Sequence, residues 1–199
     1  MEAYKITKTG EGIIPEGETI IKKDAFKMCK KLTSIVIPEG VTTIENGAFK
    51  DCINLTSITF PNSLEDIYCD AFSGCIGLTV ISIPTNVCYI EHWAFKDCES
   101  LASITVANGN KYYDSRNNCN AIINTDSNQL LFGCANTVIP DTITEIEAFA
   151  FIRCKNLTSI SIPDSVTTIG HSAFALCTNL TSVRIPEGVE IGKEAFLGC

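Results

Sequence analysis

Apolar and polar positions recur along the chain with a period of 23 residues, and Leu32–Asn54 is a typical unit. Within it, Ile35 and Ile37 alternate with Ser34 and Val36, which predicts a short strand with one buried side. A proline ends each such segment, because proline cannot donate to a strand ladder and fixes its own φ angle. All seven prolines of the chain occupy this position: Pro15, Pro38, Pro61, Pro84, Pro140, Pro163 and Pro186.

A second motif, Ala-Phe-x-x-Cys, recurs with the same period. Its apolar residues lie three or four positions apart within each unit, as on one face of a short helix or 3-10 turn. The motif occurs seven times, at 25–29, 48–52, 71–75, 94–98, 150–154, 173–177 and 195–199. If the units stack, its phenylalanines form a column inside the molecule: Phe26, Phe49, Phe72, Phe95, Phe151, Phe174 and Phe196.

Self-similarity at such a period predicts a solenoid, and Leu32, Ile35 and Ile37 fit the L-x-x-L-x-L pattern of a leucine-rich repeat. We therefore expect one domain over residues 1–199, of α/β class but mostly β. It is a right-handed leucine-rich-repeat solenoid with short parallel strands and short helical or 3-10 turns. The hand follows from the usual hand of parallel crossover connections. The expected parallel strands are 33–37, 56–60, 79–83, 102–106, 158–162 and 181–185.

The period is interrupted once, where the proline spacing rises from 23 to 56 residues. The apolar runs 121–123 and 130–132, separated by polar residues, predict a β-hairpin inside a long unit at about 107–139. Tyr112, Tyr113 and Arg116 precede the hairpin, and aromatic residues with arginine are favoured anchors of interfaces. These three are candidate ligand contacts. The alternative is a hairpin that simply completes a unit.

The outward strand positions form a second candidate surface, because solenoids bind through the face that their strands present. This face is hydroxyl-rich and nearly uncharged, which suits contact with a protein or a glycan. The alternative interpretation is ordinary β-propensity on a solvated strand. The candidate contact residues are Ser34, Ser57, Thr59, Ser82, Ser103, Thr105, Ser161 and Arg184.

Eleven cysteines stand in the chain, and seven of them belong to the repeat. We expect those six that precede the last motif to be buried free thiols, because parallel Cβ vectors in adjacent units make bridging geometry poor. The hairpin register sets Cys119 opposite Cys134, a candidate disulfide.

Cys69 and His92 share one repeat position, which is a weak metal signal, and no metal site, cofactor site or catalytic site is expected. The chain is therefore not expected to be an enzyme.

The charge balance excludes several partners. With 15 basic and 23 acidic residues the net charge is −8, and the basic residues never cluster, so neither nucleic acid nor an anionic membrane surface is an expected partner.

No apolar run reaches the ~18 residues of a membrane span, and residues 1–12 lack the apolar region of a signal peptide. The chain ends on the last motif with no polar cap, so we expect a segment of a longer protein, with end-to-end contacts between chains.

The unit L-T-S-I-x-I-P-x-x-V-T-x-I-x-x-x-A-F-x-x-C resembles the repeat of BspA-like leucine-rich-repeat proteins over residues 11–199. The resemblance implies a surface protein of gut or oral bacteria, or of mucosal protists. It also implies adhesion to another cell or to host matrix proteins such as fibronectin and fibrinogen. The expected function is thus a non-enzymatic adhesion module at the cell surface or secreted. The alternative is a cytoplasmic protein-interaction scaffold, which fits many unpaired thiols.

Overall fold

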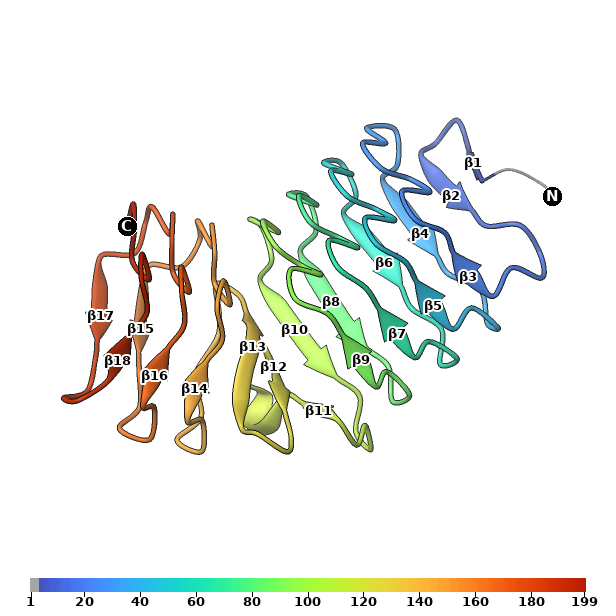
Figure 1. Ribbon diagram of the computed structural model, residues 1–199. Coiled ribbons are helices and arrows are strands. Elements are labelled where there is room, and N and C mark those ends of the chain that lie inside the picture. The colour runs from blue at the N-terminus through green and yellow to red at the C-terminus, as the bar shows by residue number, and fades with distance from the viewer. Residues whose placement is uncertain (1–3) are drawn as a thin grey trace.

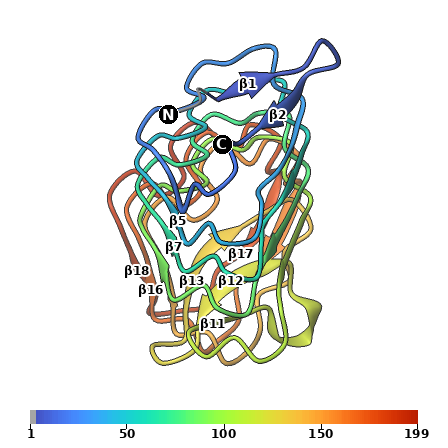
Figure 2. The same ribbon diagram turned by 90° about the vertical axis from the view of Figure 1, so that its right-hand side faces the viewer.

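The computed structural model describes residues 4–199 as a stack of coils, each built from two short strands and a turn segment (Figure 1). Viewed along the stack, the coils lie over one another (Figure 2). The first strands of the coils are β2 (Glu11–Ile13), β4 (Ser34–Val36), β6 (Ser57–Thr59), β8 (Val80–Ile83), β10 (Ser103–Val106), β15 (Ser159–Ser161) and β17 (Ser182–Arg184). The second strands are β3 (Ile20–Ile21), β5 (Thr43–Ile44), β7 (Asp66–Ile67), β9 (Tyr89–Ile90), β14 (Glu145–Ile146), β16 (Thr168–Ile169) and β18 (Glu190–Ile191).

Most neighbouring first strands pair in parallel: β2 with β4, β4 with β6, β8 with β10, and β15 with β17. Ser34 pairs with Ser57, so the register offset equals the sequence period of 23. All six expected strands are present, each slightly shorter than predicted. Ile35 and Ile37 are each 2% exposed whereas Val36 is 68% exposed. The alternation that predicted one buried side is therefore confirmed.

At the N-terminal end, β1 (Lys5–Ile6) pairs antiparallel with β2. The second strands form their own parallel ladder, from β3 through β5 and β7 to β9. The fold is thus a mostly β solenoid of stacked parallel-strand coils, as predicted. Its one short helix is η1 (Arg116–Asn118), within the part of the chain that the structure describes.

The turn segment of each coil differs in detail from the expected short helix. In the second coil, Ala48 N donates to Glu45 O at 3.1 Å, and Cys52 N donates to Phe49 O at 3.1 Å. These are the i to i+3 hydrogen bonds of a 3-10 turn. The third residue of each turn is left-handed, however, with φ of 64° at Gly47 and 58° at Asp51. A left-handed residue cannot continue a right-handed helix, so two separate turns follow one another.

The N–H groups between these turns bond to the next coil instead. Gly47 N donates to Cys69 O at 3.0 Å, and Phe49 N donates to Ala71 O at 2.8 Å. Alternate N–H groups thus close a turn or cross to the neighbour. We call residues 46–51 of this coil, and the equivalent residues of the others, the turn row. The turn rows form a third hydrogen-bonded ladder along the solenoid, beside the two strand ladders.

The phenylalanine column is confirmed. Ring centroids of Phe26 and Phe49 lie 5.1 Å apart, those of Phe49 and Phe72 lie 5.1 Å apart, and those of Phe72 and Phe95 lie 5.4 Å apart, all nearly parallel. The stack resumes from Phe151 through Phe174, at 4.7 Å, to Phe196. Six of these seven residues are at most 5% exposed, so the column is the spine of the core.

The repeat cysteines are free thiols with a common role. Cys52 Sγ donates to Phe26 O at 2.9 Å, and Cys75 Sγ donates to Phe49 O at 3.2 Å. Each thiol therefore donates a hydrogen bond to a carbonyl oxygen of the preceding coil. An apolar side chain in its place could not make this bond. The expectation of buried free thiols is confirmed for five of the six, while Cys29 is only partly buried.

Burial makes these thiols resistant to alkylation. Desolvation raises the pKa to about 12 at Cys52, Cys98, Cys154 and Cys177. We expect an alkylating reagent that needs a thiolate to leave these four unmodified near neutral pH and to modify Cys29. The stability that the fold gains by keeping these thiols neutral is fully present below the ordinary thiol pKa of 9.0. It is lost as the pH rises toward 12. Mass spectrometry of the alkylated folded chain checks this, and equal labelling of all five would contradict it.

The long unit contains the expected hairpin, formed by β12 (Ala121–Asn124) and β13 (Gln129–Gly133), with β11 (Tyr113–Asp114) on its outer side. The hairpin lies between two stacks of coils (Figure 1). Its strand β13 pairs in parallel with β14. Ile122 belongs to the apolar core of the N-terminal stack and Ile123 to that of the C-terminal stack. A strand buried on both faces therefore joins the two cores.

Candidate functional site

The hydroxyl-rich strand face lies where the alternation placed it. Thr59 and Thr105 are exposed, whereas Ser34 and Ser103 are partly buried. Thr105 Oγ1 donates to Ser82 Oγ at 3.1 Å, so neighbouring coils are linked across the face by hydroxyl groups. The remaining candidates are exposed as well: Ser57, Ser82, Ser161 and Arg184.

Arg184 contributes little free charge to this face. Its Nη2 lies 2.9 Å from Asp164 Oδ1, and its Nη1 donates to Ile162 O at 3.1 Å. The strand face is therefore a nearly neutral surface of hydroxyl groups and methyl groups. Such a surface can contact a partner without excluding it by charge.

A hollow of about 300 Å³ adjoins this face at the hairpin. Strand β10 and the turn after it form one wall, and the loop between β11 and β12 forms the other. Thr105, Tyr113 and Arg116 all line it, so the structure brings together three candidates from separate parts of the sequence. Its volume is at the lower end of the range typical of small-ligand sites.

Two of the hairpin candidates have mainly structural contacts. Tyr113 is only 6% exposed, and its hydroxyl oxygen accepts a hydrogen bond from Ile90 N at 3.0 Å. Most of the ring therefore completes the core beside β9, and little of it is available to a ligand. Arg116 forms a bidentate contact with Asp114, at 2.7 and 2.9 Å, and its Nη1 donates to Asn128 Oδ1.

Tyr112 lies outside this first hollow. It is 48% exposed and lines a second, more open hollow of about 450 Å³ together with Glu65, Asn86 and Lys111. Of the three hairpin candidates it is the one with a ring available to a partner. Tyr113 and Arg116 therefore fit the alternative interpretation, in which the hairpin segment simply completes the unit.

Cys119 and Cys134 are both buried free thiols, so the candidate disulfide is not formed in the structure. The predicted register holds at Ile123 with Leu130, but it shifts by one residue at Ile122, which pairs with Phe132. The β-bulge turns Cys134 toward Asn120, whose carbonyl oxygen accepts from the thiol at 3.3 Å. A bulge of one residue gave no signal in the sequence.

The described residues contain no cluster of three or more histidine, cysteine or acidic side chains that could hold a metal ion. His92 and His171 are both exposed, and His171 Nδ1 lies 2.7 Å from the carbonyl oxygen of Lys193. Among the described residues there is likewise no helix long and apolar enough to cross a membrane.

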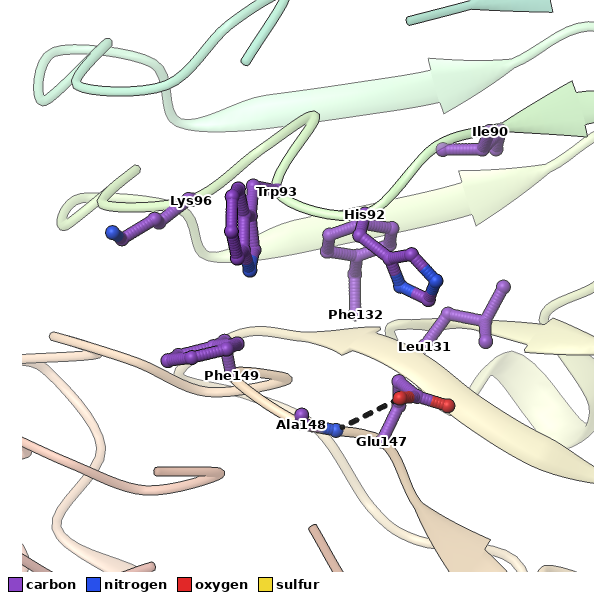
Figure 3. A pocket seen from close by; sticks show the side chains of 9 residues that line it. All are labelled: Ile90, His92, Trp93, Lys96, Leu131, Phe132, Glu147, Ala148 and Phe149. Carbon is purple, nitrogen blue, oxygen red and sulfur yellow. Dashed lines mark hydrogen bonds between the residues drawn. The ribbon is translucent and has the colours of Figure 1, made fainter. Parts of the chain in front are cut away.

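A small apolar cavity, which the sequence analysis missed, lies where the hairpin meets the turn rows (Figure 3). Its volume is about 40 Å³. Trp93 and Phe149 line it and meet edge to face, with ring centroids 5.7 Å apart and an interplanar angle of 81°. Phe132 lies behind them, and Lys96 Nζ is 5.6 Å from the centre of the Trp93 ring.

The sequence held a signal for this cavity. Trp93 and Phe149 directly precede the Ala of an Ala-Phe motif. The equivalent residues of the other coils, Asp24, Gly47, Asp70, Ser172 and Glu194, are all small or polar, and all have positive φ. Two large aromatic residues at a left-handed position are a departure from the repeat that alignment of the units reveals.

Comparison with known proteins gives one family. The model of the BspA type leucine-rich repeat region matches in six copies, over residues 19–129 and 118–199. A leucine-rich cell surface protein from Faecalibacterium prausnitzii is 32% identical with a TM-score of 0.75, over 88% of this chain and 48% of that one. Comparison with curated proteins gives no match.

Two further solved structures share the fold. The pneumococcal vaccine antigen PcpA is 23% identical with a TM-score of 0.70, over 80% of this chain and 40% of that one. The leucine-rich repeat protein of T. pallidum, TpLRR, is 24% identical with a TM-score of 0.58, over 98% of this chain and 85% of that one. The chain spans about half or less of the length of the first two.

Proposed function

Because the chain belongs to the BspA-type leucine-rich-repeat family, we propose that it is a non-catalytic adhesion module of a cell-surface protein. The module contacts a host matrix protein, or a protein or glycan of another cell. The observation that carries the proposal is the neutral hydroxyl face of β4 to β10, which ends at the hollow beside the hairpin.

The chemistry of this face supports a broad contact rather than a deep pocket. Thr59 and Thr105 offer a methyl group and a hydroxyl group each, and Val36 and Val80 are 68% and 51% exposed among them. Exposed apolar side chains rimmed by polar groups are typical of protein interaction sites. The hollow beside the hairpin loop adjoins this face at Thr105, so a partner that crosses the coils from β4 to β10 reaches Thr105 last.

An intracellular scaffold is the second candidate function. All eleven cysteines are free thiols in the structure, which favours a reducing compartment. The same strand face would then contact an intracellular protein. Fractionation of cells with an antibody against the chain separates the two candidates, since only a surface protein is labelled on intact cells.

Introducing charge on the strand face should weaken adhesion. We expect Thr59→Glu and Thr105→Glu each to weaken binding to immobilised fibronectin or fibrinogen by at least about tenfold, the effect of ~1.4 kcal/mol, because a partner would bury an unpaired carboxylate. The control is Thr178→Glu, at another exposed threonine, on the turn side. Surface plasmon resonance measures the affinities.

Equal binding by all three variants would exclude the strand face as the contact. Failure of the unchanged chain to bind either matrix protein would contradict the matrix partner itself. Circular dichroism of each variant confirms that the coils are retained.

A further inference from the structure

The second, more open hollow, of about 450 Å³, lies where the loop between β10 and β11 meets the preceding coils. Glu65, directly before β7, and Cys88, directly before β9, line it from two adjacent coils. Lys111 and Tyr112 line it from the loop. None of its lining residues belongs to a first strand, so the hollow is separate from the strand face that carries the proposed adhesion. Its volume is within the range of about 300–1,000 Å³ that is usual for small-ligand sites.

Asn110 holds the loop side of this hollow in place. Its Nδ2 group donates to Pro84 O and to Val87 O, both at 2.9 Å, and so fixes the loop to the preceding coil. Its Oδ1 atom accepts from the N–H groups of Tyr112 and Tyr113, again at 2.9 Å. The whole hydrogen-bonding capacity of this side-chain amide is therefore used to position the loop.

The Tyr112 ring faces solvent because its neighbour is anchored in the core. Tyr113 is buried, its hydroxyl oxygen accepts from Ile90 N, and adjacent side chains of an extended chain point to opposite sides. Thr125 N donates to Tyr112 O at 3.0 Å, so the hairpin also fixes the backbone at Tyr112. The ring is 48% exposed, and no other residue of the described chain bonds to its hydroxyl group. An aromatic ring is thus presented on a fixed backbone.

Polar groups without partners line the same hollow. The side chains of Glu65, Thr85 and Lys111 form no hydrogen bond or ion pair within residues 4–199. Asn86 Nδ2 donates to Asn62 O at 2.9 Å, which leaves its Oδ1 atom as an acceptor. The hollow therefore offers acceptors at Glu65 and Asn86, a donor at Lys111, and a threonine hydroxyl group that can do both.

The balance of charge favours an uncharged ligand. Glu65 and Lys111 have opposite charges, and the other side chains that line the hollow are neutral. Asp66, whose Oδ1 atom lies 3.9 Å from Cys88 Sγ, adds a negative charge nearby and disfavours an anionic ligand. A molecule with many hydroxyl groups can accept from Lys111 and donate to Glu65 at once. Its C–H groups can pack on the Tyr112 ring, because the face of an aromatic ring is negative.

We propose that this hollow binds an uncharged saccharide unit, with one face of the sugar ring stacked on Tyr112. The hydroxyl groups of the sugar hydrogen-bond to Glu65, Asn86 and Lys111. A saccharide combines the two required features, since hydroxyl groups surround its edge and C–H groups cover its faces. The biological role of this binding, attachment to a glycan of another cell or of the host matrix, rests on the proposed adhesion function. The binding itself does not.

Saturation-transfer difference NMR detects weak binding of sugars directly. The probes are the methyl glycosides of glucose, galactose, mannose and N-acetylglucosamine, mixed one at a time with the whole chain. Each is used at about 5 mM, because a contact of this size is expected to have a dissociation constant in the millimolar range. We expect transfer to the ring C–H protons of at least one probe. No transfer to any of them would overturn the proposal.

Two exposed tyrosines provide a matched pair of variants. Tyr112 is 48% exposed inside the hollow, and Tyr89 is 44% exposed on β9 outside it. We expect Tyr112→Ala to weaken binding of the probe at least about tenfold, because the stacked face is lost, and Tyr89→Ala to change it less than about twofold. Equal losses in the two variants would show general contact with exposed tyrosines and would contradict the site.

The class of ligand is tested with a charged form of the probe. The best-binding hexoside is compared with the same hexoside oxidised at C6 to a carboxylate, which keeps the ring and its other hydroxyl groups. We expect the carboxylate to bind more weakly, because Glu65 and Asp66 repel it. Equal or tighter binding of the carboxylate would show that the hollow does not select an uncharged sugar.

The strand-face variant Thr59→Glu separates this site from the proposed adhesion surface. It should weaken binding to matrix proteins and leave binding of the saccharide probe unchanged, because Thr59 does not line the hollow. Loss of saccharide binding in Thr59→Glu would contradict a separate site. If adhesion depends on Thr59 but no probe binds, the saccharide site alone is excluded and the adhesion function stands.

Discussion

Replacing Phe72 with alanine is expected to lower the free energy of unfolding by about 3–5 kcal/mol, the usual cost of emptying a packed aromatic site. Phe72 is fully buried, with Phe49 and Phe95 stacked at 5.1 and 5.4 Å and the edge of Phe60 at 5.6 Å. The backbone on both sides is fixed by the turn-row ladder, so the coils cannot collapse into the cavity. Urea unfolding followed by circular dichroism measures the loss.

Phe196→Ala is the comparison within the same column. Phe196 has one stacked neighbour, Phe174 at 5.1 Å, and is only partly buried. Its truncation should therefore cost less than half as much as that of Phe72. A loss below about 1 kcal/mol at Phe72 would mean that the column does not hold the coils together, since that is less than the usual cost of one large buried side chain.

Gly133→Ala is expected to destabilise the chain, because the added methyl group has no space in the core. A Cβ at this position would overlap the Cε1 and Cζ atoms of Phe151. That ring cannot retreat, because Phe174 is stacked on its other side at 4.7 Å. Overpacking of a core commonly costs about 1–3 kcal/mol, and here we expect the upper end of that range. Thermal unfolding monitored by circular dichroism checks the prediction.

The double variant Gly133→Ala with Phe151→Leu tests the cause. If the clash with the ring is the cause, the leucine should restore part of the stability that the alanine removes, although Phe151→Leu alone destabilises the chain. Purely additive losses in the two variants would show that Gly133 is required for another reason, such as the local backbone of the β-bulge.

Most of the architecture could be predicted from the sequence, because one unit repeats with little change. The pairing of Ser34 with Ser57 follows from the period, and the stacking of Phe49 on Phe72 follows from the Ala-Phe-x-x-Cys motif. Burial in a solenoid is set by position within the unit, and each unit contacts only its neighbours. Seven copies therefore constrain the same local structure repeatedly.

The interruption could be predicted only in outline. The two apolar runs predicted a hairpin, but not the bulge at Ile122, since the bulge depends on how the hairpin packs between two stacks. For the same reason Tyr113 was interpreted as a surface residue although it completes the core. The spacing of apolar residues also could not predict the turn geometry. Apolar residues three or four positions apart lie on one side of a helix and of two consecutive turns alike.

The register offset between coils has a consequence for how the length of such a protein can change. Because the regular coils meet their neighbours through the same kinds of ladder, a gene duplication or deletion of one whole 23-residue unit within a stack keeps the register of the junctions that remain. Each added coil lengthens the molecule by about 4.8 Å, the spacing of paired strands. The junction at the hairpin differs, because there a glycine without a Cβ lies against the ring of Phe151. The reach of such a molecule can thus change by whole regular coils without altering the hairpin junction.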